Sequence, residues 1–178
     1  MQQLKDIKLL ILDVDGVLTD GRIILGNSGE EMKFFHVQDG LGMKLLQKTG
    51  VNIAIITGKK SKIVAERMQK LGIRHVYQGV PNKLPSFEKL LKKLDVTTDQ
   101  VAYMGDDLPD LPLMQKVAFS AAPANANEFI KNHADYVSKA KGGKGAVREL
   151  CELVMQAQGN LKAMQAQFLI DGSLLNVQ

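Results

Sequence analysis

The sequence predicts an α/β fold: a doubly wound, mostly parallel sheet with helices on both faces, in a three-layer sandwich. Three observations predict this class. Short aliphatic runs recur along the chain, helical patterns separate them, and acidic residues or glycine directly follow several of the runs. Runs of this kind are typical of strands buried on both faces, and strands that alternate with helices form right-handed parallel βαβ units.

The first predicted strand is the run 9–12, which ends at Asp13 and Asp15. Further strands are predicted at 51–56, 74–77, 101–104 and, from a weaker pattern, 135–137. Apolar residues at helical spacing predict helices near 40–49, 61–71, 83–94, 109–116, 124–132 and 145–157. Predicted helices separate successive predicted strands along the chain, as a doubly wound sheet requires.

Residues 22–36 predict a β-hairpin, because apolar segments at 23–25 and 32–35 flank a turn sequence at 26–29. This hairpin directly follows the first strand and its two carboxylates. We therefore expect it to overhang the site as a flap.

The chain has 178 residues, 45% of them hydrophobic, which suffices for one core and one domain, 1–178. The last segment, 159–178, contains only Lys162 and Asp171 as charged residues and has apolar residues at 168–170 and 174–175. It is either a frayed terminal helix or a tail that docks on a neighbouring subunit, and the sequence leaves both interpretations open.

Composition and charge argue against several classes of protein. The net charge is +4 and the pI about 9.1, but lysines and arginines are scattered, without the interleaved aromatic residues of a nucleic-acid surface. No apolar segment approaches the ~20 residues of a membrane span, and we expect no signal peptide. The one cysteine, Cys151, excludes an internal disulfide framework and is expected to pack within a helix. We expect a cytoplasmic protein with a small anionic substrate.

Asp13 and Asp15 are the first candidate site residues, at the predicted carboxyl end of a buried strand, where open α/β sheets bind their ligands. Two like charges at the edge of a core are unfavourable unless a cation compensates them, so the pair indicates a divalent metal. Taken alone, the pair is equally consistent with an ordinary turn at Asp15-Gly16 and a capping role for Asp13.

Three further groups follow later strands or begin a helix, and the sheet would gather them beside the first pair. They are Thr57-Gly58, Lys83, and the carboxylates of Gly105-Asp106-Asp107-Leu108-Pro109-Asp110. Taken singly, Thr57-Gly58 is a common strand-to-helix turn and Lys83 a solvated lysine. The three carboxylates are more specific, because they repel one another unless a metal or a lysine compensates them.

Together these groups meet the requirements of phosphate monoester hydrolysis. Mg²⁺ would neutralise charge between a carboxylate nucleophile and a phosphate dianion, and we assign it to Asp13, Asp106 and the backbone carbonyl of Asp15. Thr57 and neighbouring N–H groups would donate to the phosphoryl oxygens, and Lys83 would stabilise their charge. Asp15 would protonate the leaving group and later accept a proton from water. Asp107 and Asp110 would support the site.

The four motifs resemble those of the haloacid dehalogenase superfamily of phosphohydrolases, which implies a covalent aspartyl-phosphate intermediate on Asp13. A finer resemblance, over nearly the whole chain, is to the 3-deoxy-D-manno-octulosonate (KDO) 8-phosphate phosphatase family. It rests on Asp-Val-Asp-Gly-Val-Leu-Thr-Asp-Gly at 13–21, Phe-His-Val-Gln-Asp-Gly-Leu-Gly at 35–42, Gln-Gly at 78–79 before Lys83, and Gly-Gly-Lys-Gly-Ala-Val-Arg-Glu at 142–149.

This finer resemblance implies a magnesium-dependent phosphoric monoester hydrolase that lacks a separate cap domain and releases KDO and phosphate in lipopolysaccharide biosynthesis. It also implies a homotetramer in which the hairpins and tails of neighbours help to close the site. The residues it implies in contact with the sugar acid or its phosphate are Asp15, His36, Val37, Gln38, Asp39, Gly40, Gly58, Lys59, Arg67 and Lys83.

Two positions depart from the family pattern, which usually shows arginine where this chain has Gln38 and Lys59. Lysine cannot reproduce the bidentate contact of arginine with a carboxylate, which leaves open a nonulosonate 9-phosphate of the sialic-acid type as substrate. A non-catalytic receiver domain is a further alternative, but its phosphorylated aspartate follows a middle strand, where this chain has Thr57. The loop 142–145 either binds an anion or is only the turn that leads into the last predicted helix. His75 and His133 are expected to have no role.

Overall fold

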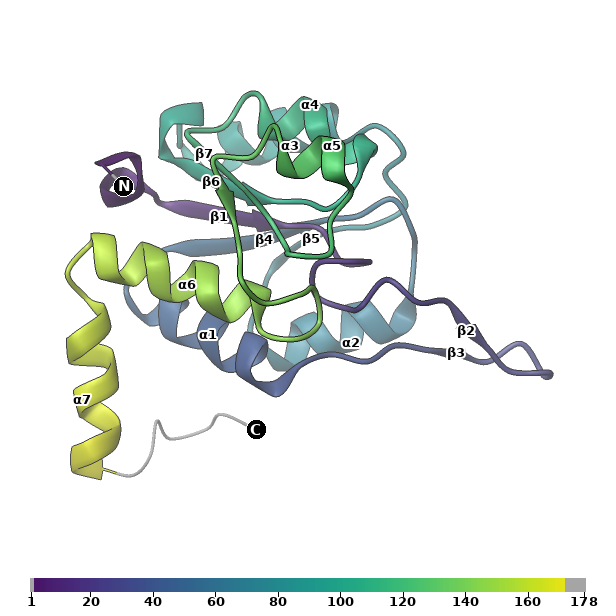
Figure 1. Ribbon diagram of the computed structural model, residues 1–178, viewed down its shortest axis with the longest axis horizontal. Helices are drawn as coiled ribbons and strands as arrows, with labels where there is room; N and C mark the ends of the chain where they lie inside the picture. Colours follow the sequence, from purple (N-terminus) through teal and green to yellow (C-terminus); the bar gives the residue numbers. More distant parts are fainter. Residues whose placement is uncertain (1, 172–178) are drawn as a thin grey trace.

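The computed structural model describes residues 2–171, and within them one six-stranded sheet has the order β5-β4-β1-β6-β7-β8 with every neighbouring pair parallel (Figure 1). This arrangement confirms the predicted fold class. The strands are β1 (Leu9–Leu12), β4 (Asn52–Ile56), β5 (His75–Tyr77), β6 (Val101–Met104), β7 (Phe119–Ala122) and β8 (Tyr136–Val137).

Helices cover both faces of the sheet: α1, α2 and α6 lie on one face and α3, α4 and α5 on the other (Figure 1). Their bounds are α1 (Val37–Lys48), α2 (Lys62–Lys70), α3 (Lys83–Leu94), α4 (Leu111–Met114), α5 (Glu128–Lys131) and α6 (Ala146–Ala157), with short 3₁₀ turns η1 (Gln2–Asp6), η2 (Thr98–Gln100) and η3 (Leu108–Asp110). Within residues 2–171, no helix is long and apolar enough to cross a bilayer.

The side chains of β1 alternate between two apolar cores. Leu10 and Leu12 belong to the core beneath α1 and α6, and Leu9 and Ile11 belong to the core beneath α3. All four side chains are buried. The unbroken aliphatic run that predicted this strand is therefore the consequence of helices on both faces.

The sequence patterns did not predict β7, and two predicted helices are shorter than expected. β7 consists of Phe-Ser-Ala-Ala, which has no β-branched residue, yet all four residues are buried because β6 and β8 pair with it on either side. The helix predicted at 109–116 is η3 followed by the single turn of α4, and Pro109 and Pro112 lie in the first turns of these two elements, where proline is tolerated. The helix predicted at 124–132 is also shorter in the structure, where only α5 is helical.

The predicted hairpin is present as β2 (Ile24–Leu25) and β3 (Glu31–Met32), which pair antiparallel. Figure 1 shows that its turn projects away from the body of the protein. Its exposed apolar side chains include Ile23, Leu25, Met32 and Phe34. Closure of the hairpin over a site remains a prediction.

A further helix, α7 (Leu161–Asp171), follows α6. It lies in the segment 159–178, which the sequence analysis interpreted as either a terminal helix or a tail docked on a neighbouring subunit. Leu161, Met164 and Phe168 pack against the core, while Leu169 is 89% exposed. The apolar pair at 174–175 lies outside the described residues. Docking of the tail on a neighbouring subunit remains a prediction.

Candidate active site

The loops that follow β1, β4 and β6 meet at the carboxyl edge of the sheet, because these three strands are neighbours in the order β4-β1-β6. Together with the start of α3 they line a cleft of about 440 Å³. The lining residues are Asp13, Asp15, Gly21, Thr57, Gly58, Lys59, Val80, Pro81, Lys83, Asp106, Asp107, Pro109 and Asp110. The structure thus brings together residues from all four sequence motifs.

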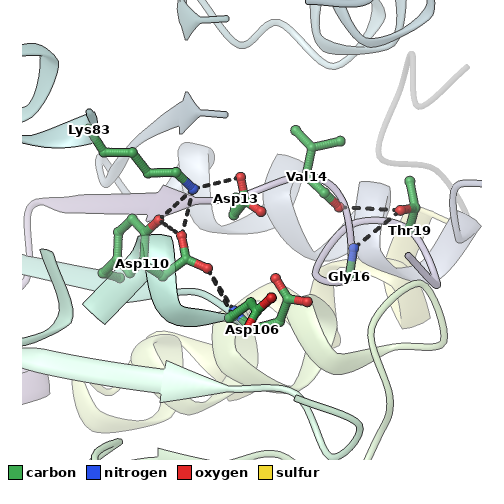
Figure 2. Close-up of polar contacts among 9 residues, drawn as sticks. Asp13, Val14, Gly16, Thr19, Lys83, Asp106 and Asp110 are labelled. Atoms are coloured by element: carbon green, nitrogen blue, oxygen red, sulfur yellow. Dashed lines mark hydrogen bonds and ion pairs between the residues drawn. The ribbon is translucent and has the colours of Figure 1, made fainter. Parts of the chain in front are cut away.

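Lys83 lies at the centre of the polar contacts in this cleft (Figure 2). It is the first residue of α3, and its side chain is only 4% exposed. Its ammonium donates hydrogen bonds to Oδ1 of Asp13 at 2.8 Å and to Oδ1 of Asp110 at 2.5 Å. This burial excludes the alternative of a solvated surface lysine.

Asp110 organises the loop after β6. Its Oδ1 faces Lys83, and its Oδ2 accepts hydrogen bonds from the backbone N–H groups of Asp106 (2.9 Å) and Asp107 (3.2 Å). Gly105 permits this close turn, since a Cβ there would lie 2.3 Å from Cβ of Asp110. Asp107 accepts a hydrogen bond from the N–H of Leu108 and caps η3. Both carboxylates therefore stabilise the loop that presents Asp106.

Tyr103 is part of the same network and was missed in the sequence analysis. Its hydroxyl donates to Oδ1 of Asp110 at 2.5 Å and accepts from Nζ of Lys83 at 3.2 Å. The residue is fully buried on β6. The available signal was a hydroxyl-bearing side chain within a buried apolar strand, two residues before Gly105.

The carboxylates carry more negative charge than the one lysine compensates. One oxygen each of Asp13, Asp106 and Asp110 lies within 4.8 Å of the others. Burial, together with the charge of Asp110, raises the pKa of Asp13 to about 6 against the opposing effect of Lys83. Burial and the charges of Asp110 and Asp13 raise the pKa of Asp106 to about 8. A divalent cation would relieve this repulsion.

Asp13 and Asp106 are the carboxylates best suited to hold that cation. Asp110 is engaged by Lys83, Tyr103 and two backbone N–H groups. Carboxylate oxygens are the ligands that Mg²⁺ prefers. The residues present therefore fit a magnesium ion.

Gly16 allows the loop after β1 to approach Asp106. Its φ is +94°, and a Cβ there would lie 1.9 Å from Oδ2 of Asp106. The loop at 142–145 packs against the loop after β1. A Cβ at Gly142 would lie 1.7 Å from the carbonyl oxygen of Gly16. The N–H of Gly143 donates to the carbonyl of Val17 at 2.9 Å. In this structure the glycine loop buttresses the loop that carries Asp15.

Thr57 and Gly58 also line the cleft. Thr57 is 3% exposed, and its backbone N–H donates to the carbonyl of Tyr77 on β5. Its own carbonyl accepts from the N–H of Val80 at 3.1 Å, which fixes the turn after β4. Lys59 follows them in the same wall of the cleft.

Asp15 lines the cleft with a side chain that is 23% exposed, and Oδ1 of Asp15 lies 2.5 Å from Nζ of Lys33. Lys33 follows β3 in the hairpin and was missed in the sequence analysis. No local pattern could have identified it, because the contact depends on where the hairpin stem runs past the loop after β1.

The remaining predicted substrate contacts do not line the cleft within the part of the chain that the structure describes. His36, Asp39, Gly40 and Arg67 surround a separate small space between α1 and α2, and Nδ1 of His36 is buried there without a hydrogen-bond partner. Val37 is 80% exposed, and Gln38 is also exposed.

Asp39 has a structural partner. Its buried carboxylate accepts hydrogen bonds from the N–H groups of Gly145 (3.3 Å) and Arg148 (2.8 Å) at the start of α6. Contact between the residues at 36–40 and a substrate remains a prediction.

Comparison with known proteins places this geometry in a family. A model of haloacid dehalogenase-like hydrolases matches residues 75–150. The 3-deoxy-D-manno-octulosonate 8-phosphate phosphatase KdsC of Escherichia coli strain K12 is 51% identical over 163 residues, which cover 92% of this chain and 87% of that protein.

Solved structures agree. The 3-deoxy-D-manno-octulosonate 8-phosphate phosphatase of Moraxella catarrhalis, in complex with magnesium, phosphate and KDO, is 46% identical with a TM-score of 0.92, covering 94% of this chain and 96% of that one. The Yersinia pestis phosphatase is 47% identical with a TM-score of 0.89, covering 90% and 87%. The chain therefore belongs to the KDO 8-phosphate phosphatase family of the haloacid dehalogenase-like hydrolases.

Proposed function

We propose that this protein hydrolyses KDO 8-phosphate to KDO and phosphate with Mg²⁺ as its cofactor, in the biosynthesis of lipopolysaccharide. The observation that carries the proposal is the cluster of Asp13, Asp106, Asp110 and Lys83 at the carboxyl edge of the sheet. Family membership supplies the substrate, since relatives that match over most of this chain carry that activity in their names.

In the first step, one carboxylate oxygen of Asp13 attacks the phosphorus atom while the bond between phosphorus and the ester oxygen breaks. Asp15 donates a proton to that oxygen, and the sugar acid leaves as an alcohol. The phosphoryl group is then bound covalently to Asp13. Lys83, which already donates to Oδ1 of Asp13, would hold that carboxylate in place and offset charge on the phosphoryl oxygens.

In the second step, water attacks the phosphorus atom and gives a proton to Asp15, and the bond between phosphorus and Asp13 breaks. Free phosphate is released and both aspartates return to their starting states. Thr57 and the backbone N–H groups around Gly58 lie in the cleft wall where they would donate to the phosphoryl oxygens.

The cofactor would be held by Asp13, Asp106 and the backbone carbonyl of Asp15. When bound, Mg²⁺ supplies positive charge that lets a carboxylate approach a phosphate dianion. The charge imbalance among the three clustered carboxylates supports this assignment.

The same proposal includes assembly into a homotetramer and a cytoplasmic location. The hairpin supports assembly, because its exposed side chains include Leu25 (71%) and Phe34 (58%), which a partner subunit would cover. The single, buried Cys151 fits a reducing compartment. Native mass spectrometry of the wild-type protein and of Phe34→Ser tests the assembly, and a monomeric wild type would contradict it.

A panel of sugar-acid phosphates tests the function. We expect rapid phosphate release from KDO 8-phosphate with Mg²⁺, loss of release after chelation, and recovery when Mg²⁺ is restored. The panel includes a nonulosonate 9-phosphate because of Gln38 and Lys59. A clear preference for that nine-carbon acid would reject the proposed substrate and retain the phosphatase chemistry.

A further inference from the structure

Lys33 is a lysine that belongs to none of the four motifs. It lies in the hairpin directly after β3, and its side chain is 4% exposed. Its ammonium contacts two carboxylates, Oδ1 of Asp15 at 2.5 Å and Oε1 of Glu31 at 3.2 Å. An ammonium group that is shielded from water needs negatively charged partners, and the carboxylates of Asp15 and Glu31 provide them for Lys33.

The second of these carboxylates extends the contact to the loop between β4 and α2. Oε2 of Glu31 accepts a hydrogen bond from Oγ of Ser61 at 2.9 Å. Ser61 precedes α2, shortly after Thr57-Gly58, and its N–H donates to Oε1 of Gln78 at 2.8 Å. A continuous series of polar contacts therefore runs from Asp15 through the base of the hairpin to the loop after β4.

The contact between Lys33 and Asp15 joins the hairpin to the loop after β1. The hairpin turn projects from the body (Figure 1). Leu25 and Met32 in its two strands have exposed side chains. Lys33 does not itself line the cleft, whereas Asp15 does. An effect of Lys33 on the reaction would therefore pass through Asp15.

We propose that Lys33 is a positioning residue that holds the carboxyl group of Asp15 at the cleft wall and ties its position to the base of the hairpin. The inference rests on the proposed function, in which Asp15 donates a proton to the leaving oxygen. Proton donors must lie within hydrogen-bond reach of the atom that they protonate, so a displaced Asp15 slows the cleavage of esters that need this proton.

Two substrates with different leaving groups test the proposal in the magnesium-loaded full-length enzyme. An alkyl ester such as KDO 8-phosphate releases a basic alkoxide that needs a proton, while p-nitrophenyl phosphate releases a stable anion that does not. In Lys33→Met, we expect kcat/KM for the alkyl ester to fall about tenfold or more and kcat/KM for the aryl ester to stay within about threefold. Because kcat/KM covers the steps through ester cleavage, it isolates the role of Asp15 as an acid.

The controls separate positioning from general damage. Lys62→Met removes a lysine whose side chain is 90% exposed, and kcat/KM should stay that of the wild type for both esters. Lys33→Arg keeps the charge and should recover part of the loss. Asp15→Asn should show the same dependence on the leaving group, and adding Lys33→Met to it should have little further effect. Equal losses for both esters, or no loss for either, would overturn the proposal.

A crystal structure of metal-free Lys33→Met gives a readout that does not depend on activity. We expect the Asp15 side chain to leave its present position when its cationic partner is removed. An unchanged Asp15 would overturn the role of Lys33. If the wild-type protein hydrolyses neither ester, the proposed function fails, and this structure still decides whether Lys33 positions Asp15.

Discussion

The ammonium of Lys83 lies 2.8 Å from Oδ1 of Asp13, although the two residues are 70 positions apart in the sequence. Asp13 directly follows β1 and Lys83 is the first residue of α3, so the contact forms only when the parallel sheet is complete. The same lysine also contacts Asp110. It thereby connects the proposed nucleophile to the loop that presents the proposed metal ligand Asp106.

The first prediction concerns the nucleophile. Asp13→Asn should abolish phosphate release, by at least about a thousandfold, because an amide cannot form the covalent phosphoenzyme. The circular dichroism spectrum should stay that of the wild type. Asp20→Asn is the matched control, because Asp20 lies in the same loop but pairs with Arg22. Retained turnover in Asp13→Asn would reject the assignment.

The second prediction concerns Gly16. Gly16→Ala should prevent Mg²⁺ from stabilising the protein and should abolish activity, because the new methyl group would overlap the Asp106 carboxylate at 1.9 Å. Gly50→Ala is a matched control: its φ is +93°, but no atom lies within 4 Å of the added Cβ. Both variants should lose about 1–2 kcal/mol from the left-handed backbone conformation. Only Gly16→Ala should lose the response to Mg²⁺ in thermal unfolding.

The third prediction concerns Tyr103. Tyr103→Phe removes the hydroxyl that donates to Asp110 and accepts from Lys83, so the free energy of unfolding should fall by about 1–3 kcal/mol. The rate of phosphate release should also fall, because Lys83 and Asp110 lose a common partner. Tyr77→Phe on β5 removes a tyrosine hydroxyl outside this network and should change the rate little. Similar effects in both variants would argue against a role for Tyr103.

The fourth prediction links pH to the metal. Burial and neighbouring carboxylates raise the pKa of Asp106 to about 8, far above the ~3.9 of an unfolded chain. Between these two values the metal-free folded state binds more protons than the unfolded state. The free energy of unfolding should therefore fall as pH rises through this window.

Mg²⁺ competes with the proton on Asp106, so its affinity should rise with pH until that group is ionised. Titration calorimetry at several pH values measures this affinity and the protons released. Asp106→Asn should flatten the pH dependence of metal-free stability and raise the melting temperature near pH 8. An unchanged pH dependence in that variant would contradict the prediction.

The motifs predicted the clustering at the carboxyl edge because each of them directly follows a strand or begins a helix, so topology alone brings them together. Lys33 and Tyr103 were not predicted, because their partners depend on the path of a hairpin stem and on the depth of a side chain within β6. β7 was missed for a similar reason. Its small residues carry no strand signal, and its neighbours in the sheet determine its conformation.

The last prediction concerns Asp39, which the family resemblance places in contact with the substrate and the structure places at the start of α6. Its carboxylate accepts hydrogen bonds from the N–H groups of Gly145 and Arg148, so it acts as a helix cap supplied by α1. Asp39→Ala should therefore lower the free energy of unfolding by about 1–2 kcal/mol, and Asp39→Asn, which keeps an acceptor, by less.

Chemical denaturation measures these changes, and Asp6→Ala removes an exposed acid as the control. If capping is the whole role of Asp39, KM for KDO 8-phosphate should stay close to that of the wild type in both variants. If the side chain also binds the sugar acid, KM should rise in Asp39→Asn although stability is largely retained. The two measurements together decide between a structural aspartate and a substrate ligand.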